Sequence, residues 1–258
     1  FGWKLLGALY QHNGRLEESL VANETAVAIW PNDSEANNNL GITLQALGRM
    51  NDAEESFKKA IWMKPDFSEA YFNLGITLQT LFRHGEAEEN YKKAIAYNPD
   101  RAEAYFNLGI TLQTLGKPEE AEQSFKKAIV IEPQHLKAHL NLGITIQSLG
   151  RFVEAEEIFN KAIVIKPDDA ETHYNLGNTL INLGSVIKAE ASYQQAIALK
   201  PDYAEAHNNL AYAFLELGKL KEAEISYRNA IAINPAYEEN CTHLLAAING
   251  LNPFRATD

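Results

Sequence analysis

The chain of 258 residues contains very little cysteine and fewer basic than acidic residues. The single cysteine, Cys241, excludes an internal disulfide framework and is compatible with a reducing compartment. Its 23 Lys and Arg residues are outnumbered by 34 Asp and Glu residues, which gives a net charge of −11. Since binding to a phosphate backbone needs a basic face, we expect no nucleic-acid partner.

Long hydrophobic runs are also missing. No stretch of about 18 consecutive apolar residues occurs, so we expect no transmembrane helix and no membrane partner. The chain starts at Phe1 without methionine or a charged leader, and no signal peptide is visible. This start is compatible with a fragment of a longer protein. We expect a cytoplasmic location.

One stretch of the sequence is repeated almost verbatim. Residues 69–81 and 103–115 both read EAYFNLGITLQTL, and weaker copies start at positions 35, 137, 171 and 205. The step is always 34 residues. Self-similarity at this period is typical of stacked units that bury their apolar faces against each other. The sequence therefore predicts a repeat array rather than one globular core.

Prolines mark the end of each unit. A proline ring removes a backbone donor and clashes with the preceding turn, so each one predicts a helix end. These prolines are Pro31, Pro65, Pro99, Pro133, Pro167, Pro201 and Pro235. An Asp follows four of them and a Glu comes three residues later, which resembles a capping box and predicts a helix start. The pairs are Asp66–Glu69, Asp100–Glu103, Asp168–Glu171 and Asp202–Glu205.

A glycine near the middle of each unit divides it into two short helices, because glycine readily adopts the left-handed conformation of a helix C-cap. These glycines are Gly14, Gly48, Gly116, Gly150, Gly184 and Gly218. The third unit has Phe82 in this column and Gly85 three residues later. We therefore expect the third turn to be shifted or strained.

Small residues recur on both helices of a unit, and they should let the helix axes approach closely. On the first helices they are Gly7, Gly41, Gly75, Gly109, Gly143 and Gly177, with Ala211 in the last unit. On the second helices they are Ala53, Ala87, Ala121, Ala155, Ala189 and Ala223.

This pattern resembles the tetratricopeptide repeat. The first unit carries Trp3-x2-Leu6-Gly7-x2-Tyr10, and later units carry Ala53-x3-Phe57 and its equivalents before the closing proline. The resemblance implies an all-α fold: an α-solenoid, a right-handed superhelix of seven helix pairs whose first helices line a concave groove. The units it implies are 1–33, 34–67, 68–101, 102–135, 136–169, 170–203 and 204–237. Residues 238–250 are expected to form a capping helix, followed by a tail or linker at 251–258.

The groove is expected to bind a peptide or protein segment. An amide side chain has donors and an acceptor, so a row of them can pair with a peptide backbone of any sequence. The row of asparagines resembles the one in the repeat groove of O-linked N-acetylglucosamine transferases, where asparagines hold an extended substrate. The alternative is that the asparagines fix the helix pairs. The amide positions are Asn39, Asn73, Asn107, Asn141, Asn175, Asn209, Gln79 and Gln113.

Apolar residues run beside the amides. A contiguous exposed apolar patch usually marks a contact site, here for ligand side chains or, alternatively, for self-association. The positions are Phe72, Phe106, Leu140, Tyr174, Ile76 and Ile110.

The sequence predicts no catalytic, cofactor or metal site. His139, His173 and His207 share one column, but equivalent positions of stacked helices lie about 8–10 Å apart and cannot share one ion. We interpret them as half-buried packing residues. The Glu and Lys pairs of the second helices, such as Glu54 and Lys58, are interpreted as a solvated face.

Three functions remain open. The first is a protein–protein interaction module. The second is the substrate-recruiting arm of a larger transferase. Residues 243–258 resemble the junction in bacterial repeat–methyltransferase fusions, whereas the asparagine row points instead to a glycosyltransferase. The third is a scaffold that self-associates through its ends or its groove.

Overall fold

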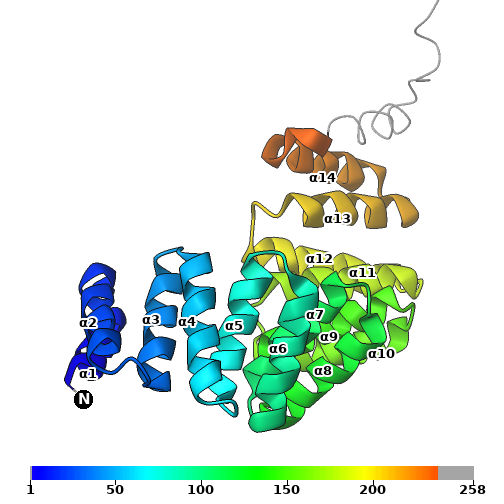
Figure 1. The fold of residues 1–258 in the computed structure, drawn as a ribbon. Helices are drawn as coiled ribbons and strands as arrows, with labels where there is room; N and C mark the ends of the chain where they lie inside the picture. Colours follow the sequence, from blue (N-terminus) through cyan, green and yellow to red (C-terminus); the bar gives the residue numbers. More distant parts are fainter. Residues whose placement is uncertain (1, 238–258) are drawn as a thin grey trace, which may run out of the picture. The chain divides into compact units, whose positions relative to one another are not determined.

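The computed structural model describes residues 2–237, which fold into fourteen α-helices and one short 3-10 helix (Figure 1). The helices form consecutive packed pairs, as the sequence predicts. The predicted cap at 238–250, the tail at 251–258 and Cys241 lie outside the described residues. The chain divides into an N-terminal unit that ends at Pro133 and a C-terminal unit that begins at Gln134.

The N-terminal unit contains α1 (Gly2–His12), α2 (Leu16–Ile29), α3 (Ser34–Ala46), α4 (Met50–Met63), α5 (Ser68–Thr80), α6 (His84–Tyr97), α7 (Ala102–Thr114) and α8 (Pro118–Ile131). The C-terminal unit contains α9 (Leu136–Ser148), α10 (Phe152–Ile165), α11 (Ala170–Asn182), α12 (Val186–Leu199), α13 (Ala204–Glu216), α14 (Leu220–Ile233) and η1 (Pro235–Tyr237).

Within each unit, a second helix packs both on its own partner and on the first helix of the next pair. In the N-terminal unit α2 packs on α3, α4 on α5 and α6 on α7, and in the C-terminal unit α10 packs on α11 and α12 on α13. The first helices of neighbouring pairs also contact each other. The first helices of a unit therefore form one continuous face.

The two helices of a pair approach closely where an aromatic ring lies on a glycine. A Cβ atom added to Gly109 would lie 2.5 Å from Cε1 of Phe125, and one added to Gly41 would lie 2.6 Å from Cε1 of Phe57. Both rings are completely buried. The predicted role of the glycine column is thus confirmed, and each glycine makes room for a specific ring.

The predicted capping boxes are wrong. Helices α5, α7, α11 and α13 begin two residues after the predicted Asp, so the N-cap is the next residue, for example Phe67 or Asp169. Asp169 does cap α11, because its carboxylate accepts from the backbone N–H of Thr172 at 3.0 Å. Each Glu lies in the first helical turn, where the helix dipole favours a negative charge.

The turn between α5 and α6 keeps the geometry of the glycine turns although Phe82 occupies the glycine position. Phe82 has φ +58°, the left-handed conformation. Its N–H donates to the carbonyl of Gln79 at 3.0 Å, as Gly48 donates to Gln45. The turn is therefore not shifted but strained, and Gly85 lies inside α6.

Candidate peptide-binding face

The predicted site residues lie on the first helices of both units. In the N-terminal unit, α3 carries Asn39, α5 carries Phe72, Asn73, Ile76 and Gln79, and α7 carries Phe106, Asn107, Ile110 and Gln113. In the C-terminal unit, α9 carries Leu140 and Asn141, α11 carries Tyr174 and Asn175, and α13 carries Asn209. Each unit thus presents its own face.

The expected exposure of the apolar row is wrong for two of its six positions. Phe72 and Leu140 are each only 7% exposed. The Phe72 ring packs on Tyr91, with 6.0 Å between centroids, and the guanidinium of Arg101 covers it at 3.7 Å. Phe106 is half-buried against Phe125. These rings complete the packing of the second-helix aromatic residues, which is why they are not free to form a surface patch.

Two asparagines of the predicted row link neighbouring repeats. Nδ2 of Asn73 donates to Oδ1 of Asn38 at 3.2 Å. In the C-terminal unit, Nδ2 of Asn209 donates to Oδ1 of Asn178 at 2.8 Å and to the Tyr174 hydroxyl at 3.3 Å. For Asn73 and Asn209, the structural alternative considered from the sequence is therefore supported.

Other amides are bonded within the repeat that carries them. Asn141 and Asn175 each donate to the carbonyl four residues earlier at 2.9 Å. Gln79 accepts from the hydroxyl of Tyr91 at 2.8 Å, and burial raises the pKa of that hydroxyl. The oxygen of Gln79 therefore accepts the hydrogen bond of the buried tyrosine hydroxyl. The NH2 group of Gln79 can donate a hydrogen bond to a ligand.

Sequence reasoning missed the role of Asn178, which accepts from the hydroxyl of Tyr193 at 2.8 Å. A signal was present, because the aromatic column of the second helix holds tyrosine in this repeat and the isoleucine column of the first helix holds asparagine. When a polar residue replaces the isoleucine that faces a tyrosine, the polar residue is the expected hydrogen-bond partner of the tyrosine hydroxyl.

A half-exposed stripe of amide and isoleucine side chains lies on the first helices of the N-terminal unit. It combines an asparagine row, an isoleucine row and a glutamine row on α3, α5 and α7. We call it the inner stripe, and it consists of Asn39, Ile42, Gln45, Ile76, Gln79, Asn107, Ile110 and Gln113. Amides with apolar groups between them can hydrogen-bond a peptide backbone and contact its side chains.

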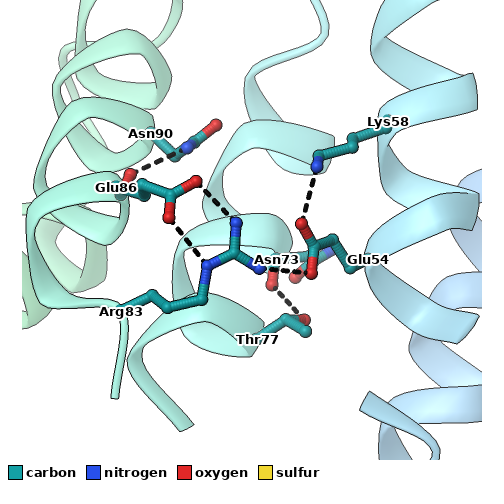
Figure 2. Close-up of polar contacts among 7 residues, drawn as sticks. All are labelled: Glu54, Lys58, Asn73, Thr77, Arg83, Glu86 and Asn90. Atoms are coloured by element: carbon teal, nitrogen blue, oxygen red, sulfur yellow. Dashed lines mark hydrogen bonds and ion pairs between the residues drawn. The ribbon is translucent and has the colours of Figure 1, made fainter. Parts of the chain in front are cut away.

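A second set of polar residues lies between the second helices and the following turns (Figure 2). The Glu54 carboxylate accepts from Lys58 at 2.6 Å and from Nη1 of Arg83 at 2.7 Å, and Arg83 also pairs with Glu86. The Glu54 side chain is only 12% exposed. The interpretation of Glu54 as part of a solvated face is therefore wrong, because it joins one repeat to the next.

The same arrangement recurs at intervals of one repeat. Glu88 pairs with Lys92 and Lys117, and Glu190 in the C-terminal unit pairs with Lys219. In each case a cation 29 residues after the glutamate closes the contact. An acidic residue and a basic residue at this spacing are the sequence signal that would have found these pairs.

The histidine column serves packing, as expected. His207 is 8% exposed, and its Nε2 lies 3.0 Å from the carbonyl of Pro201; His173 makes the same contact with Pro167 at 2.9 Å. These contacts hold the proline turn against the following helix. Over residues 2–237, no group of three or more His, Cys, Asp or Glu side chains is placed to hold a metal ion.

No helix in the described part of the chain has the length and apolar character needed to cross a membrane.

The fold and the repeated face define a protein built from stacked helix pairs. Sequence models described as tetratricopeptide repeat match residues 2–66 and 67–131, and related models match 112–174 and 174–238. The chain therefore belongs to the tetratricopeptide repeat (TPR) family. No curated protein matches the chain.

Many solved structures share the fold. The crystal structure of YrrB, described as a TPR protein with an unusual peptide-binding site, is 22% identical, with a TM-score of 0.66 over 72% of this chain and 95% of YrrB. A MamA structure is 28% identical, with a TM-score of 0.60 over 64% of this chain and 97% of MamA. PilF of Pseudomonas aeruginosa is 20% identical, with a TM-score of 0.66 over 78% of this chain and 92% of its own.

Proposed function

We propose that this chain is a protein-interaction module and that the inner stripe binds an extended segment of another protein. The observation that carries the proposal is the recurrence of the same half-exposed residues on α5 and α7, Ile76 with Ile110 and Gln79 with Gln113. All four side chains keep part of their surface open to solvent.

The spacing of the stripe suits an extended chain. Packed helices lie about 8–10 Å apart, so each row repeats at roughly that interval. An extended chain rises about 3.3 Å per residue. Every third residue of a ligand would then meet an equivalent amide and an equivalent isoleucine, and three repeats would hold a segment of about nine residues. The amides would read the backbone and the isoleucines would contact apolar side chains.

The proposed binding site contains fewer residues than the sequence predicts. Phe72 and Leu140 are buried, and Asn73 and Asn209 are bonded between repeats, so removing them would disturb packing. The likeness to YrrB, whose structure is described as having a peptide-binding site, supports the general role. The methyltransferase-arm alternative depends on residues 243–258, which lie outside the described range, and the glycosyltransferase-arm alternative depends on the asparagine row alone. Both stay predictions.

The test is a peptide-display selection on the whole chain, followed by affinity measurements. The test variant combines Asn107→Ala with Ile110→Ala. The matched control combines Glu55→Ala with Lys59→Ala, an exposed ion pair on α4. Selected peptides should bind the test variant at least about tenfold more weakly, a loss of about 1.4 kcal/mol, and should bind the control like the wild type. Equal affinity for all three proteins would refute binding at the inner stripe.

A further inference from the structure

A polar pocket lies between two neighbouring first helices of the C-terminal unit, α11 and α13, with one wall from α12. Its volume is about 260 Å³. We call it the asparagine pocket, because three of its side chains are asparagines and all of them are uncharged. The lining residues are Asn178, Ile181 and Asn182 of α11, Tyr193 of α12, and Asn209 and Tyr212 of α13.

The asparagine pocket occurs where two columns of the inner stripe exchange their chemistry. In α3, α5 and α7 an isoleucine is followed three residues later by a glutamine, as in Ile76 and Gln79. In α11 the same two columns hold Asn178 and Ile181. The polar and apolar positions are therefore reversed, and a ligand side chain that suits the isoleucines of the N-terminal unit does not suit this pocket.

The amide of Asn178 is held in one orientation. Its Oδ1 accepts from the Tyr193 hydroxyl at 2.8 Å and from Nδ2 of Asn209 at 2.8 Å. Burial raises the pKa of the Tyr193 hydroxyl, so this hydroxyl keeps its proton and donates. A flipped Asn178 would place its NH2 group against the NH2 group of Asn209. Since this NH2 group makes no hydrogen bond within residues 2–237, it is available to a ligand.

Asn182 supplies the complementary acceptor. Its Nδ2 donates to the backbone carbonyl of Asn178 at 2.8 Å, which leaves its Oδ1 without a hydrogen bond in the described part of the chain. The side chain is exposed and lines the pocket. Tyr212, which is 46% exposed, and Ile181 add apolar surface to the lining. The pocket therefore offers one donor group and one acceptor beside an apolar wall.

We propose that the asparagine pocket binds a primary carboxamide, the side chain of a glutamine or asparagine in a partner protein. The NH2 group of Asn178 donates to the carboxamide oxygen, and Oδ1 of Asn182 accepts from the carboxamide NH2 group. The methylene groups of the ligand pack on Ile181 and Tyr212. The inference rests on the proposed role of the chain as a protein-interaction module, but it does not depend on the inner stripe.

The uncharged lining distinguishes a carboxamide from side chains of similar shape. A glutamate carboxylate would lose hydration without meeting a cation of the lining, and it has no proton to donate to Asn182. A methionine side chain would leave both Asn178 and Asn182 without a partner, which is unfavourable for polar groups removed from water. A glutamine side chain satisfies both groups.

The test is an NMR titration of the whole chain with N-acetylglutamine methylamide, which reproduces a glutamine residue within a peptide. The readout is the side-chain NH2 resonances of Asn178 and Asn209, together with the backbone N–H resonances of α11 and α13. We expect saturable shifts with a Kd in the millimolar range, as for a small fragment. The glutamate and methionine analogues should bind at least about tenfold more weakly, because a site built for hydrogen bonds rejects analogues that lack them.

A double variant, Asn178→Ile with Tyr193→Phe, removes the donor without leaving a buried hydroxyl unpaired. It recreates the pair Ile110 and Phe125 of the fourth repeat, and circular dichroism should show unchanged helix content. It should bind the glutamine probe at least about tenfold more weakly and the methionine analogue no more weakly than the wild type does. Asn141→Ala is the matched control, because it removes a half-buried amide of the same unit outside the pocket; it should leave the affinity for glutamine unchanged.

Asn182→Ala is a second variant at an exposed position, where folding is not at risk, and it should also weaken glutamine binding. Shifts that do not saturate, equal affinities for the three probes, or full affinity in Asn182→Ala would each refute the proposal. Tighter binding of free glutamine than of the blocked probe would identify a small molecule as the ligand and would contradict the assignment to a protein side chain. The inner-stripe variant, Asn107→Ala with Ile110→Ala, should bind the probe like the wild type, so failure of the inner stripe and failure of the asparagine pocket are distinguishable.

Discussion

Arg83 donates to the carboxylate of Glu54 at 2.7 Å and thereby joins the turn before α6 to the second helix of the preceding repeat (Figure 2). Lys58 binds the other carboxylate oxygen at 2.6 Å. The contact between repeats is therefore partly ionic, although it lies beside a core of alanine and aromatic residues. Its stability should depend on the protonation state of the carboxylate.

Glu88→Gln tests this dependence at the next interface. Hydrogen bonds from Lys117 and then Lys92 lower the pKa of Glu88 below its usual value of 4.5. Because the folded pKa is the lower one, the stabilisation is fully present above pH 4.5 and is lost as the pH falls through the folded pKa. Urea unfolding should show the variant less stable by about 1 kcal/mol at neutral pH, and the difference should disappear in acid.

The control for this prediction is Glu89→Gln, which removes an exposed carboxylate from the same helix. Its stability should follow the wild type over the whole pH range. A difference between Glu88→Gln and the wild type that stays constant down to acid pH would show that the ion pairs of Glu88 do not cause it.

Phe82→Gly should stabilise the protein. A left-handed backbone costs a residue with a Cβ atom about 1–2 kcal/mol, and glycine adopts it freely. The Phe82 side chain is 83% exposed, so little packing is lost when it is removed. We expect a gain of about 1 kcal/mol in the free energy of unfolding, and Gly116→Ala, with φ +70° at the equivalent position, should lose a similar amount. Two variants that change stability in the same direction would contradict the strain argument.

Gly109→Ala should destabilise the N-terminal unit, because the new Cβ atom would lie 2.5 Å from the buried ring of Phe125. Overpacking of this kind costs about 1–3 kcal/mol, against a gain of up to about 1 kcal/mol from helix propensity. Gly85→Ala is the matched control, since nothing lies within 4 Å of its Cβ position. Thermal unfolding should rank Gly85→Ala at or above the wild type and Gly109→Ala below it; the reverse order would contradict close packing at Gly109.

The repeat architecture was predictable because the same packing constraint recurs at the same position of every unit. A glycine facing a ring, as at Gly41 and Phe57, is visible in the sequence as two conserved columns within the chain itself. The helix starts were harder, because Asp168 and Asp169 are adjacent candidates and only the backbone decides which carboxylate reaches the Thr172 N–H.

The exposure of the binding face could not be predicted from periodicity. Phe72 lies on the predicted face of its helix, but Tyr91 and Arg101, from the following helix and turn, cover its ring. Whether the Asn73 amide is available to a ligand likewise depends on Asn38 in the preceding repeat, which accepts its hydrogen bond. The sequence gives the column in which a residue lies, whereas its exposure depends on neighbours from two other elements.

In the first repeat, Asn23 replaces the aromatic residue that faces the glycine in the other repeats. Asn23 is completely buried, and its Nδ2 donates to Ser19 at 3.3 Å and to Thr43 at 3.0 Å. Its Oδ1 has no hydrogen-bond partner among residues 2–237. An unsatisfied buried oxygen costs about 1–3 kcal/mol. The position is therefore a weak point of the first helix pair.

Combining Ser19→Ala with Asn23→Phe would recreate the arrangement of Ala53 and Phe57 and place a ring on Gly7. We expect the double variant to gain about 1–3 kcal/mol, because it removes the unsatisfied oxygen and buries apolar surface. Thr43 keeps a partner, the carbonyl of Asn39 at 3.1 Å. Hydrogen exchange should slow most in α2, whereas Asn23→Ala, which leaves a cavity, should speed it there. Faster exchange in the double variant would show that the polar network stabilises this pair better than a ring does.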